Sequence, residues 1–296
     1  MAAAATSSLT DAARLASALP PLLVAAQRVA STVMQGVHGR RRVGQGDAFW
    51  QFRQYRPGDA INRIDWRQTA KSRAVYVRET EWEAAASVWL WRDGSPSMDF
   101  ASGRNVPKKK HRAEVLLLAL STLLVDAGER VALLGGNDRP SSGRAVPRRL
   151  VGTLSDNALL GANESTPPRV PLPAHGHVVL IGDLLDPLEQ IEAVVRHYAA
   201  HGVHGHLVQV LDPAEEDLPY DGHVKFSGLE REGDHTIRKV EAVREAYQAR
   251  LVAQKEGLQR IAQSVAWTWR PHRTDRSPET ALLSLYMAMA DTGRRA

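Results

Sequence analysis

The chain has 296 residues, a formal net charge of +5 and no cysteine. The lack of cysteine excludes a disulfide framework, a thiolate zinc site, an iron–sulfur cluster and a cysteine nucleophile. With 43% hydrophobic and 24% charged residues, the composition is that of a globular protein rather than of a disordered or collagen-like chain.

Residues 1–38 are expected to form an N-terminal helical segment. They are rich in Ala, Leu and Val and are interrupted by the pair Pro20-Pro21, which predicts one or two short helices. The apolar stretch Leu15–Ala26 is too short for a membrane span, which takes about 20 apolar residues, and the amino end lacks the basic flank of a signal peptide. We therefore expect a cytoplasmic protein without membrane insertion.

Residues 39–86 are expected to form a separate β-hairpin element. Apolar and polar residues alternate over 48–67 and again over 74–82, and Pro57-Gly58-Asp59 supplies a turn. Alternation with a period of two is typical of half-buried strands, and Pro and Gly favour tight turns.

The same element contains a group of charged and aromatic residues with two interpretations. One is a turn held by Arg–Asp pairs around a buried Trp, and the other is a recognition surface for a partner; the residues are Arg56, Asp59, Arg63, Asp65 and Trp66. Five of the seven Trp lie between residues 50 and 91. This favours a packed junction between the hairpin element and the sheet that follows, whereas exposed Trp would suggest a binding hot spot.

Residues 87–296 show the pattern of an α/β domain. Short apolar runs predict buried strands, and longer amphipathic runs predict helices. We expect a hairpin over 219–238, strands over 87–91, 131–134, 177–181, 207–211 and 265–269, and helices over about 111–127, 147–160, 187–200, 239–263 and 278–291. This alternation predicts a mostly parallel sheet with helices on both faces.

Two of the predicted strands end in oxygen-bearing side chains. The first strand is followed by Asp93, Ser95 and Ser97 at alternate positions of a tight turn, and strand 177–181 is followed by Asp183. In a parallel sheet both carboxyl ends lie at the edge where ligands bind. Two carboxylates and two hydroxyls suit Mg²⁺ or Mn²⁺ rather than zinc or copper. The alternative is an Asp–Ser turn that caps a helix, with Asp183 in a similar local role.

Three further groups are expected to be structural. His201, His204 and His206 flank a helix-to-strand turn, and we expect structural or solvated histidines rather than a metal site. The basic run Lys108–Arg112 is expected to be a solvated loop, with contact to an acidic partner as the alternative. The acidic residues after strand 207–211 are expected to begin a short helix; they are Asp212, Glu215, Glu216 and Asp217.

The chain lacks several motifs of nucleotide- and ester-processing enzymes. It contains no Walker phosphate loop, no Gly-x-Gly-x-x-Gly that opens a helix and no Gly-x-Ser-x-Gly elbow. Catalysis is therefore unsupported by motif, and we lean towards a non-enzymatic protein.

Three segments of the chain resemble a known bacterial family. They resemble the family catalogued as domain of unknown function number fifty-eight, from about Gly39 to the end; the segments are FWQFRQYRPGDAINRIDWRQTAKS, VRETEWEAAASVWLWRDGSPSM and LVQVLDPAEEDLP. The resemblance implies a von Willebrand factor A-like (Rossmann-type) fold. It also implies a gene beside a MoxR-type AAA+ ATPase, in pairs thought to act in protein assembly or maturation.

The strand-end loop resembles the metal-ion-dependent adhesion site of von Willebrand factor A domains. This resemblance implies that Asp93, Ser95 and Ser97 form the first ligand loop and that Asp183 takes the later acidic position. Such sites usually also draw a Thr from a second loop, for which the chain offers Thr153 and Thr166.

These observations predict a protein-interaction module with an adhesion-type metal site. A divalent ion at the strand ends would be presented to a carboxylate of a client protein, with a MoxR-type ATPase working alongside. Two alternatives stay open: a metal-dependent hydrolase that uses the same carboxylates, and nucleic-acid binding through the basic runs Arg40–Arg42 and Lys108–Arg112. Because we expect both runs to lie outside the acidic strand-end site, we expect no nucleic-acid partner.

Overall fold

The computed structural model describes residues 21–38, 49–56, 59, 61, 64–72, 74–80, 85–155, 164–229 and 233–292. The chain divides into two compact units, one formed by residues 36–85 and the other by residues 1–35 together with 86–296. No helix among the described residues combines the length and the apolar character needed to cross a membrane.

The smaller unit is built on an antiparallel pair of strands. Strand β1 (Phe49–Gln54) pairs with β2 (Tyr76–Thr80), and a single helical turn, α3 (Trp66–Thr69), lies between them in the chain. Each of the two alternating stretches, 48–67 and 74–82, contains one strand, but the first stretch does not stay extended, because its end lies in α3. The predicted turn at Pro57-Gly58 and the basic run Arg40–Arg42 lie outside the described residues.

The expected burial of Trp66 is wrong. Its side chain is 65% exposed, because Trp66 is the first residue of a helical turn that Asp65 caps with its carboxylate. Among the described residues of this unit, an ion pair joins Asp59 to an arginine outside the group singled out in the sequence: Arg53 Nη2 lies 2.9 Å from Asp59 Oδ1. Hydrogen bonds from Arg53 hold the pKa of Asp59 below its usual value, while Arg63 lies outside the described residues.

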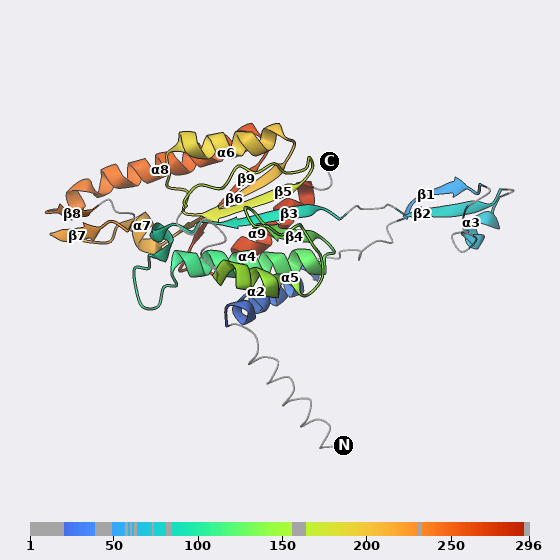
Figure 1. Ribbon diagram of the computed structural model, residues 1–296, viewed down its shortest axis with the longest axis horizontal. Coiled ribbons are helices and arrows are strands. Elements are labelled where there is room, and N and C mark those ends of the chain that lie inside the picture. Colours follow the sequence, from blue (N-terminus) through green and yellow to red (C-terminus); the bar gives the residue numbers. More distant parts are fainter. Residues whose placement is uncertain are drawn as a thin grey trace, which may run out of the picture. The chain divides into compact units, whose positions relative to one another are not determined.

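Figure 1 shows the larger unit as a parallel sheet between layers of helices. In the described part of the chain, five strands form this sheet in the order β4-β3-β5-β6-β9, and each neighbouring pair is parallel; they are β3 (Ser87–Arg92), β4 (Arg130–Leu133), β5 (His177–Gly182), β6 (His204–Leu211) and β9 (Thr268–Arg273). In chain order this is 2-1-3-4-5, a doubly wound arrangement whose connections change direction between β3 and β5. The predicted α/β class with a parallel sheet is confirmed.

Helices cover both faces of the sheet, as predicted. Their bounds are α2 (Pro21–His38), α4 (Lys109–Asp126), α5 (Val146–Ser155), α6 (Leu188–Ala200), α8 (Glu241–Ser264) and α9 (Pro278–Thr292). On one face α4 packs on β3, β4 and β5 and also contacts α5 and α9, and α2 lies beside it. On the other face α6 and α8 pack on each other and on β6 and β9.

Three short elements complete the larger unit. The predicted hairpin is present as an antiparallel pair, and the elements are η2 (Pro96–Asp99), α7 (Pro213–Asp217), and the pair β7 (Val224–Ser227) and β8 (Asp234–Ile237). η2 and α7 directly follow the carboxyl ends of β3 and β6, so both lie near the edge of the sheet where ligands are expected.

The core of the larger unit lies on both faces of β3, because successive strand residues point in opposite directions. Trp89 and Trp91 belong to the core covered by α6 and α8. Gly205 in β6 leaves space in that core for Trp267, since a Cβ there would lie 2.1 Å from the indole ring. Trp82, from the expected junction with the hairpin element, lies outside the described residues.

Several boundaries differ from the prediction. Helix α2 begins at Pro21, where proline is tolerated because the first helical amide needs no partner. The strand expected over 265–269 is displaced to Thr268–Arg273, since α8 continues to Ser264 and Ala266 adopts a left-handed turn with φ +58°. The helix expected over 147–160 is described over Val146–Ser155, and the rest of the expected range lies outside the described residues.

Candidate functional site

Asp93 leaves the sheet directly after β3. Its amide donates a hydrogen bond to the Ile181 carbonyl of β5 at 2.8 Å, so the backbone is still attached to the neighbouring strand. Its buried carboxylate accepts a hydrogen bond from the Ser95 amide at 2.8 Å. This close approach to β5 requires a glycine, because a Cβ at Gly182 would lie 2.8 Å from the Asp93 Cβ. Gly182 therefore determines where the first carboxylate can lie.

Side-chain hydrogen bonds join the remaining predicted residues. The hydroxyl oxygens of Ser95 and Ser97 are 2.8 Å apart, and the Ser97 hydroxyl donates to Asp183 Oδ2 at 2.7 Å. Ser97 lies in η2, whose tight turn begins at Pro96. The structure thus brings together Asp93, Ser95, Ser97 and Asp183, all four residues that the sequence predicted, at the β3–β5 pair.

The sequence prediction missed one further member of the site, Lys109. Its side chain is 0% exposed, and its Nζ lies 2.9 Å from Asp183 Oδ2 and 2.6 Å from Glu215 Oε1. The expectation that the run 108–112 is a solvated loop outside the site is therefore wrong at this residue, whereas Lys108 is exposed.

The start of α4 explains the different surroundings of these two neighbours. The helix begins at Lys109, whereas Lys108 is its N-cap residue and has a non-helical backbone (φ −54°, ψ 144°), so the two side chains leave the chain in different directions. Lys109 shares a helix face with the buried residues Ala113, Leu116 and Leu120. This apolar periodicity is visible in the sequence and would have placed Lys109 on the buried face, had the helix been predicted to begin two residues earlier.

The acidic residues after β6 form a short helix, as predicted. Asp212 caps α7 by accepting a hydrogen bond from the Ala214 amide at 2.8 Å, and Glu215 Oε2 accepts one from the Asp212 amide at 2.8 Å. Asp212 also accepts a hydrogen bond from the Ser102 amide at 2.9 Å. The second Glu215 oxygen contacts Lys109, so α7 is attached to the strand-end site.

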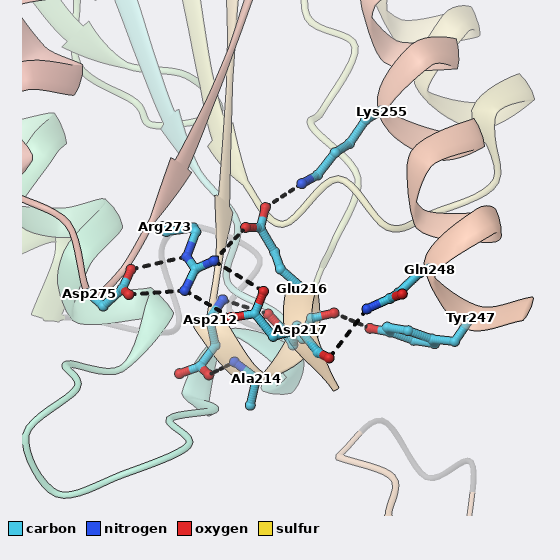
Figure 2. Close-up of polar contacts among 10 residues, drawn as sticks. Asp212, Ala214, Glu216, Asp217, Tyr247, Gln248, Lys255, Arg273 and Asp275 are labelled. Atoms are coloured by element: carbon cyan, nitrogen blue, oxygen red, sulfur yellow. Dashed lines mark hydrogen bonds and ion pairs between the residues drawn. The ribbon is translucent and has the colours of Figure 1, made fainter. Parts of the chain in front are cut away.

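Figure 2 shows how α7 is tied to α8 and β9 as well. The Arg273 guanidinium, at the end of β9, lies 3.4 Å from a Glu216 carboxylate oxygen and 3.1 Å from one of Asp217. From α8, Lys255 pairs with Glu216, and the Tyr247 hydroxyl donates to a backbone carbonyl of α7 at 2.6 Å. Together with the contact between Glu215 and Lys109, these ion pairs and hydrogen bonds link the five-residue helix α7 to α4, α8 and β9.

The charges at the strand-end site are unevenly compensated. Burial alone would lower the pKa of Lys109, but the charges of Asp183 and Glu215 outweigh it and raise that pKa. Asp93 differs, because no Lys, Arg or His in the described part of the chain forms an ion pair with it. Burial, followed by repulsion from Asp183, raises the pKa of Asp93 to about 7. The first ligand loop thus carries an uncompensated carboxylate beside two hydroxyls.

These oxygen atoms fit a hard divalent ion. Carboxylates and hydroxyls are the ligands that Mg²⁺ and Mn²⁺ prefer, and Asp93 lacks a cationic partner among the residues described. Within the same residues no group of three or more His, Cys, Asp or Glu side chains is arranged to hold a metal. The hydroxyls of Ser95 and Ser97 would therefore have to complete the ligand set, and Lys109 would compete with the ion for Asp183.

Of the two candidate threonines, Thr166 belongs to the segment nearer this site. The Gly94 amide donates to the Glu164 carbonyl at 3.4 Å, which brings the start of that segment against the first ligand loop. Thr153 lies within α5, where its hydroxyl donates to the Arg149 carbonyl at 3.3 Å. A second-loop threonine would therefore have to be Thr166.

Three neighbouring histidines lie at or near the amino ends of β5 and β6, away from the strand-end site, whereas the buried His272 lies near the carboxyl end of β9. His177 and His204 begin β5 and β6, and the ring centroid of His177 lies 5.3 Å from that of His204 and 6.1 Å from that of His206. Burial lowers the pKa of His177 to about 4 and that of His206 to about 3. His206 Nδ1 lies 2.8 Å from the Thr268 hydroxyl. Neutral, buried rings agree with the predicted structural role.

A comparison with protein families decides which family contains this chain. The family described as "Protein of unknown function DUF58" matches residues 51–257, more than two thirds of the chain. The chain belongs to the DUF58 family. Uncharacterized proteins of Mycobacterium tuberculosis strain H37Rv (Rv1480) and Mycobacterium bovis (Mb1516) are similar to it, each with 28% identity over 236 residues, 74% of this chain and 72% of the relative. The family resemblance inferred from the sequence is confirmed.

Two solved structures align with part of this DUF58 protein. One is the crystal structure of a conserved hypothetical protein, BatB, from Bacteroides thetaiotaomicron, with a TM-score of 0.40 and 16% identity. The other is an aerotolerance-related membrane protein from Bacteroides fragilis, with a TM-score of 0.41 and 17% identity. Each alignment covers 70% of this chain and 100% of the other.

Proposed function

We propose that this DUF58 protein is a non-enzymatic protein-interaction module whose strand-end site holds Mg²⁺ or Mn²⁺. The observation that carries the proposal is the meeting of Asp93, Ser95, Ser97 and Asp183 at the β3–β5 pair. Doubly wound sheets bind ligands where the direction of their connections changes, and β3 and β5 form that point here. We further propose that the sheet is of the von Willebrand factor A type, in which this edge carries an adhesion-type metal site.

Each residue has a role that follows from its chemistry. Asp93 supplies the negative charge that anchors the ion, directly or through water, and the hydroxyls of Ser95 and Ser97 supply neutral oxygen ligands. Asp183 completes the set, either by binding the ion or by orienting Ser97, with which it shares a hydrogen bond. An octahedral ion keeps a further position, which a Glu or Asp of a client protein would fill.

The surroundings of the site favour a protein ligand. Leu185 follows Asp183 by two residues and is 42% exposed, and its amide donates to Asp183 Oδ1 at 3.4 Å. An apolar side chain beside a cation would contact a protein surface around the carboxylate that binds the ion. No histidine among the described residues is hydrogen-bonded to the side chains of the four site residues, so a hydrolase would have to use one of the site's own carboxylates as its general base.

A MoxR-type AAA+ ATPase is the proposed working partner. The support for this is the family resemblance, which pairs such proteins in assembly or maturation of other proteins. In this arrangement the DUF58 protein would hold a client through the strand-end ion while the ATPase supplies mechanical work. The proposal therefore needs two contacts, one with the client at the ion and one with the ATPase elsewhere.

The central test combines ion binding with partner capture. We expect the purified wild-type chain to bind Mn²⁺ in an electron paramagnetic resonance titration and to capture a client protein from its own cell extract only with Mg²⁺. The Asp93→Asn variant, which removes the anchoring charge, should lose both properties. The matched control is Asp99→Asn, which removes an exposed carboxylate that pairs with Lys108. Capture that survives both the Asp93→Asn change and a chelator would contradict the proposal.

The two alternative functions have distinct signatures in the same preparation. A metal-dependent hydrolase would turn over phosphoesters in the presence of Mg²⁺ or Mn²⁺ and would lose turnover in Asp93→Asn. A nucleic-acid-binding protein would bind DNA or RNA with an affinity that falls steeply with salt concentration. We expect neither turnover nor such binding.

A further inference from the structure

We propose that Lys109 is a built-in cation of the strand-end site, which neutralises Asp183 when no divalent ion is bound and limits how tightly such an ion binds. This inference rests on the proposed function, since it describes the regulation of the same ion site. It adds a residue that neither the sequence motif nor the family comparison assigns to the site.

The first observation is the complete burial of Lys109. A lysine is almost never fully buried unless it is paired, and the Lys109 side chain is 0% exposed with two carboxylates within 2.9 Å of its Nζ. Removal of one partner from such a pair leaves a buried charge uncompensated, which is strongly unfavourable. Lys109 and the carboxylates of Asp183 and Glu215 therefore act as one unit.

The second observation is that Lys109 and the first ligand loop meet at the same atom. Asp183 Oδ2 lies 2.9 Å from Lys109 Nζ and 2.7 Å from the Ser97 hydroxyl oxygen. A divalent ion that takes Ser97 and Asp183 as ligands would come close to the ammonium group, and two positive charges repel each other strongly in a buried site. Lys109 thus opposes the ion, and its hold on Asp183 sets part of the ion affinity.

The third observation is that Glu215 gives Lys109 an alternative partner. Glu215 Oε1 lies 2.6 Å from Lys109 Nζ, and Glu215 Oε2 is fixed by the Asp212 amide at 2.8 Å. When an ion takes up the charge of Asp183, Lys109 can stay paired with Glu215 instead of being buried alone. Glu215 belongs to α7, and the Tyr247 hydroxyl of α8 donates a hydrogen bond to its backbone carbonyl, so the alternative partner of Lys109 is itself held in place.

Two substitutions with opposite expected effects test this role. Lys109→Met removes the competing charge, so we expect the Mn²⁺ dissociation constant to fall by about tenfold or more. The melting temperature should also rise more with Mn²⁺ than it does for the wild type, since the ion then neutralises Asp183. The matched control is Lys108→Met, which removes the exposed neighbouring charge and should bind Mn²⁺ as the wild type does.

Glu215→Gln provides a second variant, which retains a hydrogen-bonding side chain and keeps the test decisive if Lys109→Met fails to fold. The lost carboxylate leaves more of the Lys109 charge facing Asp183, so we expect the Mn²⁺ dissociation constant to rise several-fold. Glu216→Gln is its control on the same helix. Wild-type affinity in every one of these two variants that folds would overturn the role of Lys109 and leave the ion site standing. An absence of Mn²⁺ binding in every chain, the wild type included, would overturn the ion site itself.

Discussion

The Gly182→Ala substitution tests whether Gly182 positions Asp93 at the strand-end site. An added Cβ would lie 2.8 Å from the Asp93 Cβ and 3.0 Å from Asp93 Oδ2. Carbon atoms normally approach to about 3.5 Å or more, so the overlap is roughly 0.7 Å. Asp93 cannot move away freely, because its amide is bonded to the Ile181 carbonyl and its carboxylate to the Ser95 amide. Overpacking of this kind typically costs about 1–3 kcal/mol.

The assay is a pair of measurements on Gly182→Ala and Gly103→Ala. A Cβ at Gly103 meets nothing within 4 Å, so this control should keep the wild-type free energy of unfolding. Gly182→Ala should lower the free energy of unfolding by about 1–3 kcal/mol, and each kcal/mol corresponds to roughly 2–4 °C in melting temperature. It should also weaken Mn²⁺ binding. Equal stability and equal Mn²⁺ affinity in the two variants would refute the claim that Gly182 positions Asp93.

Three further predictions concern other parts of the molecule. The pKa values of His177 and His206 are lowered to about 4 and about 3, so between these values and pH 6.5 the unfolded chain binds protons that the folded one does not. The contribution of these two histidines to stability should therefore be complete above pH 6.5 and fall as the pH is lowered, by about 1.4 kcal/mol per pH unit for each histidine. Urea unfolding of a His177→Gln, His206→Gln double variant should lack this contribution and so show a different pH dependence from the wild type, and an unchanged slope would contradict this. Gly205→Ala would place a Cβ 2.1 Å from the Trp267 ring and should cost about 3 kcal/mol or more in chemical unfolding; a loss below 1 kcal/mol would mean that Trp267 repacks easily. Trp66→Ala should change the free energy of unfolding by less than about 0.5 kcal/mol, because the side chain is 65% exposed, and a large loss would restore the rejected interpretation of a buried Trp66.

The strand-end residues were predictable because their placement depends on local pattern and on one topological rule. The apolar strands β3 and β5 stand out in the sequence, and Asp93 and Asp183 directly follow them. Parallel strands bring their carboxyl ends to the same edge, so two carboxylates far apart in the chain could be expected to meet. The exposed Trp66 was mispredicted because a single capped turn can direct a large apolar side chain to solvent, and composition does not reveal this.

Lys109 marks the limit of such reasoning. A run of five basic residues normally indicates a solvated segment, and the expectation holds for Lys108. It fails one residue later, since α4 begins there and its buried face is set by contact with the sheet. The shift of the last strand from 265–269 to Thr268–Arg273 has a similar cause, because the end of α8 is a matter of helix packing rather than of local apolarity.

The sequence alone therefore determined the α/β class, the family and the four oxygen-bearing residues at the strand ends, since each of these follows from local periodicity or from a short motif. Only the tertiary structure decided which charges meet those oxygens. It placed Lys109 between Asp183 and Glu215, residues that are 74 and 106 positions away in the chain. Burial makes that arrangement significant, because in a site of low polarity an unpaired charge is costly and each cation and carboxylate must be compensated by its neighbours in space.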